Sequence, residues 1–241
     1  MMKIGNTAVD KIYIGATKVE KVYLGAELVY SAAPAIPIDG LVAYYKNIFD
    51  NIDSFGTSTL TNNGVTSTVD KNNIINSSGY FNRAEVDYSY GTIGQSINAY
   101  TICCEFKLDT LVSGNYALVT ANNVNSKIRG VLFTTGNQIN LYVGSPTSQN
   151  FIAHQWPTKD TNWHKMVARF DGINSCVCID GVILSTDNLW RATGIAPISS
   201  NEVAIGASRS NLLSTASFSG KIAKVFLYNK ALTDISFYQN V

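Results

Sequence analysis

Two tryptophans lie in polar, turn-rich stretches of the sequence, at residues 155–157 and 188–191. A large aromatic ring in a loop can stack on the apolar face of a sugar, while amide and charged groups bond to the sugar hydroxyls. The alternative is that such a ring folds back over the core as a lid. The residues selected in this way as ligand contacts are Trp156, Trp190, Arg191 and Asn188, with Tyr142 and Arg129 as further candidates.

Two acidic loops offer the oxygen atoms that a calcium ion prefers. Calcium takes roughly six to eight oxygen ligands, usually including carboxylates. Asp50 and Asp53 lie in one loop and Asp70 in the other, although no fixed spacing selects them. Calcium bound by these residues is therefore an open alternative, and no other cofactor is expected.

The cysteines and histidines do not form a reactive pattern. Cys103, Cys104, Cys176 and Cys178 lie in apolar runs, unlike the loop-spaced framework of a disulfide-rich domain or the C-x-x-C pairs of a zinc site. We expect four free thiols that pack as small hydrophobes. The two histidines, at positions 154 and 164, have no nucleophile motif beside them, which argues against nucleophilic catalysis.

The balance of charge excludes further classes of protein. The chain has 18 basic and 17 acidic residues, so it lacks the basic excess with which a nucleic-acid-binding surface releases counterions. No run approaches the roughly 18 apolar residues of a membrane helix, and membrane insertion is not expected. The first residues lack the apolar core of a signal peptide, which predicts synthesis in the cytoplasm.

A ten-residue repeat fills residues 1–30. An aliphatic residue followed by glycine recurs at positions 4–5, 14–15 and 24–25, with valine at positions 9, 19 and 29. This spacing predicts short strands separated by tight turns that begin at glycine. Such strands are too short to bury a core of their own, so we expect copies from other subunits or a partner to complete it. The alternative is an ordinary β-meander attached to the main domain.

The repeats resemble the short N-terminal repeats of bacteriophage tail, fibre and head-decoration proteins, in the pattern Lys-x-Tyr-x-Gly-x-x-x-Val. The resemblance implies a docking or oligomerisation segment that contacts other virion proteins. It favours a homotrimer, because fibre-like phage proteins are commonly threefold. Residues 31–37 are rich in proline and alanine and are predicted to be a linker.

From residue 38 to 241, short apolar runs alternate with turn residues, which predicts an all-β fold. In residues 100–106 the alternate positions are apolar, so that strand should bury one face and turn Glu105 the other way. The fold class expected is a two-sheet antiparallel jelly-roll sandwich preceded by a small β-repeat segment. Strands are predicted at residues 41–45, 100–108, 116–120, 131–134, 139–143, 165–170, 175–179, 203–205 and 222–228.

Several motifs in this region resemble those of laminin G-like domains of the concanavalin A-like group. Residues 162–172 and 177–181 are similar to the family's Trp-His and Asp-Gly core, and residues 218–233 are similar to its closing strand. Residues 40–45 and 203–206 resemble two further strands. The resemblance implies a jelly roll over residues 38–241 that binds glycans or proteins, often with calcium at its rim.

Some concanavalin A-like proteins cleave glycans with carboxylates in a Glu-x-Asp-x-x-Glu strand. The nearest match here is Glu85-Val86-Asp87, and Tyr90 stands in place of the second glutamate. We therefore expect no catalysis. The function expected is that of a virion-associated adhesin, decoration or fibre protein that binds a cell-surface glycan or protein receptor. The alternatives are a purely structural virion subunit and a bacterial surface lectin.

Overall fold

A computed structural model of the 241-residue chain shows two compact units, the first of residues 1–37 with 234–241 and the second of residues 38–233. Leu232 is tied to the sandwich by its N–H, which donates to Thr101, and by its carbonyl, which accepts from Arg169. The structure describes residues 3–4, 7–8, 13–14, 17–19, 21–24, 27–31, 36–93, 99–111, 116–123, 127–133, 137–143, 151–187, 202–207, 217–235 and 238.

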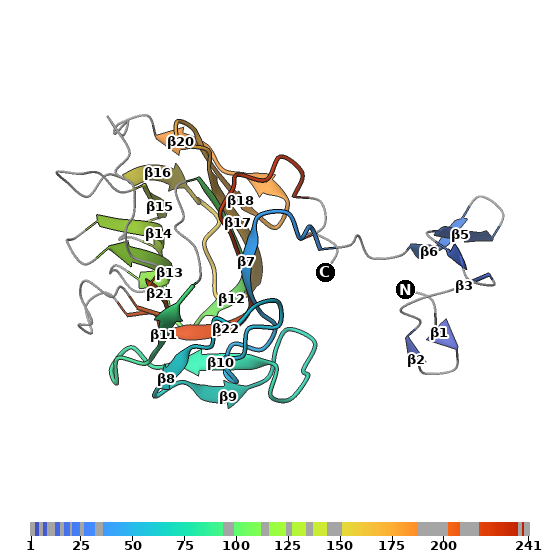
Figure 1. Ribbon diagram of the computed structural model, residues 1–241, viewed down its shortest axis with the longest axis horizontal. Helices are drawn as coiled ribbons and strands as arrows, with labels where there is room; N and C mark the ends of the chain where they lie inside the picture. Colours follow the sequence, from blue (N-terminus) through green and yellow to red (C-terminus); the bar gives the residue numbers. More distant parts are fainter. Residues whose placement is uncertain are drawn as a thin grey trace. The chain divides into compact units, whose positions relative to one another are not determined.

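The first unit contains three β-hairpins, one for each repeat (Figure 1). The three ladders have matching registers, with Ile4 opposite Thr7, Ile14 opposite Thr17 and Leu24 opposite Glu27. In each repeat the paired strands stand on either side of a two-residue interval of the sequence that begins with glycine, the spacing that the repeat predicts. The strands are β1 (Lys3–Ile4), β2 (Thr7–Ala8), β3 (Tyr13–Ile14), β4 (Thr17–Lys18), β5 (Lys21–Leu24) and β6 (Glu27–Ser31).

The second unit is a sandwich of two antiparallel sheets, which confirms the predicted fold class (Figure 1). The first, which we call the β12 sheet, runs β19-β18-β17-β12-β22-β10-β9, and β7 pairs with the end of β22. Its strands are β7 (Leu41–Tyr45), β9 (Thr66–Thr68), β10 (Ser78–Phe81), β12 (Tyr100–Leu108), β17 (Trp163–Phe170), β18 (Ser175–Ile179), β19 (Val182–Ile183) and β22 (Gly220–Tyr228).

The second sheet, which we call the β15 sheet, runs β20-β16-β15-β14-β13-β21-β11-β8. Alternate residues of each strand point to opposite faces, so one face of each sheet lies on the core and the other points away from it. The strands are β8 (Thr61–Asn63), β11 (Tyr88–Thr92), β13 (Tyr116–Asn123), β14 (Lys127–Phe133), β15 (Gln138–Val143), β16 (Phe151–Gln155), β20 (Thr186–Asp187) and β21 (Glu202–Ile205).

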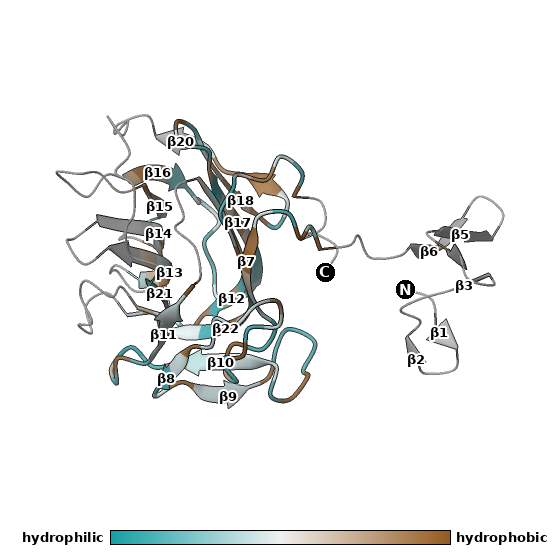
Figure 2. Ribbon diagram, viewed as in Figure 1, coloured by the Kyte–Doolittle hydropathy of each residue, from teal (hydrophilic) through white to brown (hydrophobic). Residues whose placement is uncertain are grey.

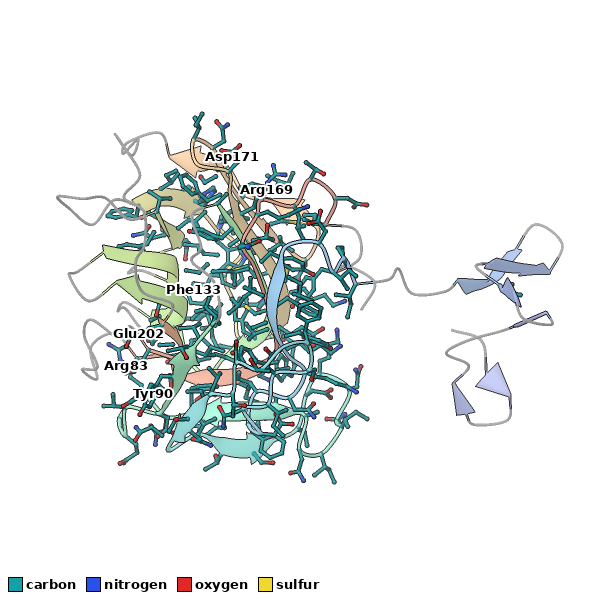
Figure 3. All side chains as sticks on the ribbon, viewed as in Figure 1. Arg83, Tyr90, Phe133, Arg169, Asp171 and Glu202 are labelled. Atoms are coloured by element: carbon teal, nitrogen blue, oxygen red, sulfur yellow. The ribbon has the colours of Figure 1, made fainter. Side chains whose placement is uncertain are left out.

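The core lies between the two sheets and is aliphatic and aromatic. Ile102, Cys104 and Phe106 of β12 face Val131 and Phe133 of β14 in one continuous cluster, as the alternation in residues 100–106 predicts. Side chains fill the space between the layers, Phe133 among them (Figure 3). Apolar residues follow strands such as β7, whereas the connections around β8, β9 and β10 are largely hydrophilic (Figure 2). Hydrophobic burial between the sheets therefore holds the sandwich together.

No helix in the described part of the chain is long and apolar enough to cross a membrane.

Candidate functional site

The outer face of β15 and β16 carries aromatic and amide side chains. In β15 the residues Ile139, Leu141 and Val143 belong to the core, so Asn140 and Tyr142 point away from it. The register places Gln138 opposite Gln155, Asn140 opposite Ala153 and Tyr142 opposite Phe151. We call the residues Gln138, Asn140, Tyr142, Phe151 and Gln155 the β15–β16 patch.

An aromatic pair forms one end of this patch. The ring centroids of Tyr142 and Phe151 lie 5.3 Å apart with an interplanar angle of 40°. Together with Ala117 they make a small cluster that is separate from the core between the sheets. Phe151 is half-buried, and the backbone carbonyl of Tyr142 accepts a hydrogen bond of 2.7 Å from the hydroxyl of Tyr100. The pair is therefore anchored from beneath and offers part of one ring to a ligand.

Asn140 lies between the aromatic pair and the two glutamines. Its side chain is 5% exposed, and its Oδ1 atom has no hydrogen-bond partner. Burial raises the pKa of Tyr142, and a hydrogen bond from Asn140 opposes that rise, so the amide nitrogen of Asn140 is already used. A buried acceptor without a partner costs about 1–3 kcal/mol, and a ligand hydroxyl that donated to it would recover part of this free energy.

The chemistry of the patch suits non-covalent recognition of a neutral polar molecule. It combines aromatic rings for stacking with three amide side chains that donate and accept hydrogen bonds. Half-buried Gln138 and Gln155 form the other end, roughly four residues or 13 Å along the strand from the aromatic pair. Of the five side chains in the patch, the phenol of Tyr142 is the one that titrates.

The prediction that Trp156 contacts a ligand is wrong. Its side chain is 2% exposed and belongs to the core. Its ring lies 5.9 Å from Phe133, 6.0 Å from Phe106 and 4.9 Å from His164. The polar sequence around Trp156 hides the fact that β12 and β14 supply an aromatic pocket for it, so the lid alternative is correct.

The other sequence candidates have different outcomes. Tyr142 lies in the β15–β16 patch, as described above. Arg129 lies in β14, opposite Val143, but its side chain is outside the described residues. Asn188, Trp190 and Arg191 also lie outside them. Ligand contact by these four residues therefore stays a prediction. For Arg129 the structure adds only its position in a strand.

Part of the patch could have been found from the sequence, because its residues in β15 alternate with apolar ones. Gln138, Asn140 and Tyr142 alternate with Ile139 and Leu141, which is the pattern of a strand with one face away from the core. The alternation does not say which strand lies alongside. Pairing with β16, across residues 144–150, is what brings Phe151 and Gln155 to the same face.

The three acidic candidates for calcium serve the loops in which they lie. Asp53 accepts backbone hydrogen bonds from Tyr44 and Ser58, among others, at 3.0 and 3.2 Å. Burial raises the pKa of Asp53, but the backbone donors outweigh burial and hold it below the ordinary value. Asp50 and Asp70 accept from backbone N–H groups within four residues of themselves.

These carboxylates are not gathered around one point. Within the described ranges, no three side chains of His, Cys, Asp or Glu come together in a way that could hold a metal ion. Asp53 is buried at 7% exposure and its oxygens already accept from the backbone, so it is a poor ligand. The described residues do not fit a calcium site.

The partial glycosidase motif lies in a turn. Asp87 is buried, and its Oδ2 accepts a hydrogen bond of 2.8 Å from the backbone of Asn82, which closes the turn before β11. Glu85 is exposed, and Val86 between them has a positive φ of 59°. The two carboxylates therefore do not extend from one strand face, the arrangement that the hydrolase motif requires.

His164 and His154 are both buried. The Nδ1 atom of His164 lies 2.6 Å from Oδ2 of Asp180, and its Nε2 atom lies 2.9 Å from Oδ1 of Asp160. His154 points between the sheets, and its Nε2 atom lies 3.0 Å from Oγ of Ser175. Burial lowers the pKa of His154 to about 4, although the Leu184 carbonyl raises it slightly. Both rings thus connect segments of the sandwich.

The four cysteines are free thiols, as predicted. Cys103, Cys104 and Cys178 are buried in strands, and Cys176 is partly exposed. Burial raises the pKa of each thiol, which keeps all four in the unreactive protonated form.

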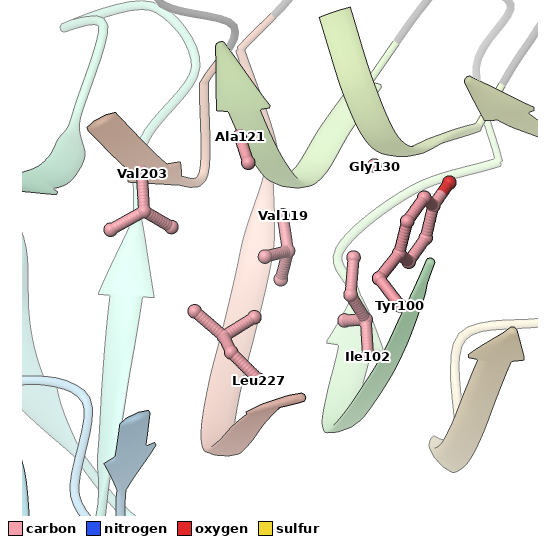
Figure 4. A pocket seen from close by; sticks show the side chains of 7 residues that line it. All are labelled: Tyr100, Ile102, Val119, Ala121, Gly130, Val203 and Leu227. Atoms are coloured by element: carbon pink, nitrogen blue, oxygen red, sulfur yellow. The ribbon is translucent and has the colours of Figure 1, made fainter. Parts of the chain in front are cut away.

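A cavity between the sheets is too small to be a ligand site (Figure 4). Its volume is about 10 Å³, room for about one water molecule. The lining is apolar and comes from both layers: Tyr100, Ile102, Val119, Ala121, Gly130, Val203 and Leu227.

Several solved structures share this fold at low sequence identity. The botulinum neurotoxin serotype C1 binding domain is 12% identical, with a TM-score of 0.60 over 83% of this chain and 52% of its own. A Trypanosoma rangeli sialidase is 16% identical, with a TM-score of 0.60 over 92% and 35%. The chain thus spans about half the length of the first and a third of the second.

Domain 4 of an extracellular arabinanase from Geobacillus stearothermophilus, solved in complex with arabinotriose, is 18% identical. Its TM-score is 0.52 over 83% of this chain and 98% of its own. A comparison with curated proteins found no match.

A family model described as the concanavalin A-like lectin/glucanases superfamily matches residues 78–235. The match covers more than half of the chain and begins at β10, so it includes both sheets of the sandwich. This agrees with the motifs read from the sequence, and the chain belongs to the laminin G-like branch of the concanavalin A-like lectin/glucanase superfamily.

Proposed function

We propose that this chain is a non-catalytic carbohydrate-binding protein and that the β15–β16 patch is its binding site. The observation that carries the proposal is the unpartnered Oδ1 atom of Asn140, buried between an aromatic pair and two glutamines. A sugar has the complementary groups, with an apolar ring face for Phe151 and hydroxyl donors for the amides. The arabinotriose bound to the arabinanase domain supports a sugar as the ligand of this fold.

The absence of catalysis is part of the proposal. Asp87 is committed to its turn and Tyr90 occupies the position of the second glutamate in the hydrolase motif. The patch itself contains no carboxylate to act as acid, base or nucleophile.

The test begins with a glycan array that identifies a ligand for the wild-type chain. Phe151→Ala should then weaken binding of that glycan by about tenfold, because a buried aromatic contact is worth more than about 1 kcal/mol. Asn140→Ala should weaken it as well, since the hydroxyl loses its acceptor. Calorimetry measures both affinities, and chromatography of the recovered glycan should show it intact.

Phe55→Ala is the matched control, because Phe55 is 47% exposed in a loop outside the patch. It should leave the affinity unchanged. Wild-type affinity in both patch variants, or cleavage of the glycan, would show that the proposal is wrong.

We also propose that residues 1–30 attach the chain to a bacteriophage particle and assemble it into a homotrimer. The support is the matching register of three hairpins, each of which has too few residues to bury a core alone. The glycan-binding sandwich would then be presented on the virion as part of a fibre or decoration protein.

A further inference from the structure

The outer face of the β12 sheet contains a buried carboxylate. Ile102, Cys104 and Phe106 of β12 belong to the core, so Glu105 points to the opposite face, as its position in the sequence predicts. Glu105 is nevertheless 1% exposed. A carboxylate that is so well covered needs charged or hydrogen-bonding neighbours.

Three lysines from separate segments surround Glu105. Lys71 comes from the connection between β9 and β10, and its Nζ atom donates to Oε1 at 2.7 Å. Lys224 of β22 has its Nζ atom 4.0 Å from the same oxygen, at the point where a β-bulge interrupts the pairing with β12. Lys165 of β17 lies directly opposite Glu105 in the register. The carboxylate thus lies at the centre of a cluster that we call the Lys71–Lys165–Lys224 cluster.

The cluster has more positive charge than Glu105 neutralises. Three ammonium groups share one carboxylate, and the lysines act on one another. Burial, followed by the charges of Lys71 and Lys224, lowers the pKa of Lys165 to about 8, although Glu105 opposes the shift. Glu105 also acts on Tyr44 of β7, whose pKa burial and Glu105 both raise. Folding has therefore brought three like charges together at a cost in stability.

We propose that the Lys71–Lys165–Lys224 cluster binds a tetrahedral oxyanion, either a sulfate or a phosphate group. The side chains of Lys71 and Lys224 are 26% and 23% exposed, which leaves both accessible to a small ion. An ammonium group has three donors, so one lysine can bond to Glu105 and to an oxyanion at the same time. A doubly charged anion would place a counter-charge between Lys71 and Lys224, which both already interact with Glu105. This site lies on the β12 sheet and does not depend on the proposed sugar site.

The experiment measures binding of sodium sulfate and sodium phosphate to the full-length chain by calorimetry at pH 7. Sodium chloride maintains a constant ionic strength, which removes the general effect of screening. We expect saturable binding of both anions to the wild type. Lys165→Gln and Lys224→Gln should each weaken it by about tenfold or more, because each removes a charge-assisted hydrogen bond.

Lys230→Gln is the matched control, because the ammonium group of Lys230 pairs with Asp39 and is not part of the cluster. It should leave anion affinity unchanged. Glu105→Gln gives a second readout that does not depend on binding strength alone. Loss of the carboxylate leaves three repelling lysines, so the melting temperature should fall and sulfate should restore it.

A third arm distinguishes a free ion from a group on a larger molecule. A sulfated oligosaccharide that binds more tightly than both inorganic sulfate and its unsulfated form would identify a glycan sulfate as the occupant, and equal affinity for the two sulfates would identify the free ion. The proposal is wrong if neither anion saturates the wild type, or if Lys230→Gln weakens binding as much as the cluster variants.

Discussion

At the scale of single residues, the role of a side chain depends on contacts that its sequence neighbours do not reveal. Trp156 and Tyr142 were both candidate ligand contacts. Distant strands supply a pocket that buries Trp156, whereas the alternation of β15 turns Tyr142 outward. Asp53 was a candidate metal ligand and instead organises a loop through backbone bonds. Local polarity therefore predicted where side chains of interest lie in the chain but not what they touch.

His154 gives a prediction about pH. Its pKa is about 4 in the folded chain and about 6.5 when exposed, so between these values the unfolded chain binds a proton that the folded chain does not. The free energy of unfolding should therefore fall as pH decreases from about 6.5 to about 4, by up to about 3 kcal/mol from this residue.

His154→Gln should remove that contribution, since glutamine does not titrate but can still contact Ser175. Urea denaturation of both proteins between pH 7.5 and 4.5 measures the two slopes. Other groups titrate alike in both, so the wild type should lose more stability on acidification than the variant. Parallel curves would mean that His154 does not couple folding to pH.

At the scale of elements, most strands of the sandwich were predictable because hydrophobic alternation is a local property. The runs at residues 41–45 and 175–179 became β7 and β18 with the same bounds. The short strands β8 and β9 were not predicted, because their residues are polar and mostly exposed. The β15–β16 patch was missed for a different reason. Its two halves are joined by strand pairing, which a single sequence does not specify.

Gly130 in β14 lies so close to the backbone of the neighbouring strand β13 that a larger residue would not fit. It has a φ of 132°, and a Cβ atom there would lie 2.2 Å from the carbonyl oxygen of Val119 in β13. Gly130→Ala should therefore cost more than the roughly 1–3 kcal/mol of an unfavourable φ, because the ladder between β13 and β14 must also shift.

The control is Gly172→Ala, at a glycine with a φ of 107° in the turn between β17 and β18. That variant should lose only the conformational term. The urea midpoints of the two variants and the wild type give the comparison, and equal losses would contradict close packing at Gly130.

At the scale of the whole molecule, the chain combines a sandwich with a large core and a segment of hairpins. The core of residues 38–233 has apolar side chains from both sheets in one cluster. Each strand of the first unit is two to five residues long, and its described residues form three separate two-stranded ladders. Two-stranded hairpins of this kind are marginal in water by themselves. The first unit therefore has the stronger need for a neighbour.

This difference predicts that assembly depends on the first unit. The full-length chain should be an oligomer, with a trimer favoured, and a chain that begins at residue 38 should be a folded monomer. Identical hairpins around a symmetry axis would supply apolar surface to one another and cover their exposed strand edges. Light scattering coupled to size-exclusion chromatography measures the mass of both chains, and circular dichroism checks that the shorter one is folded. A monomeric full-length chain would leave docking onto a different virion protein as the role of residues 1–30. An oligomeric shorter chain would place the interface between copies on the sandwich.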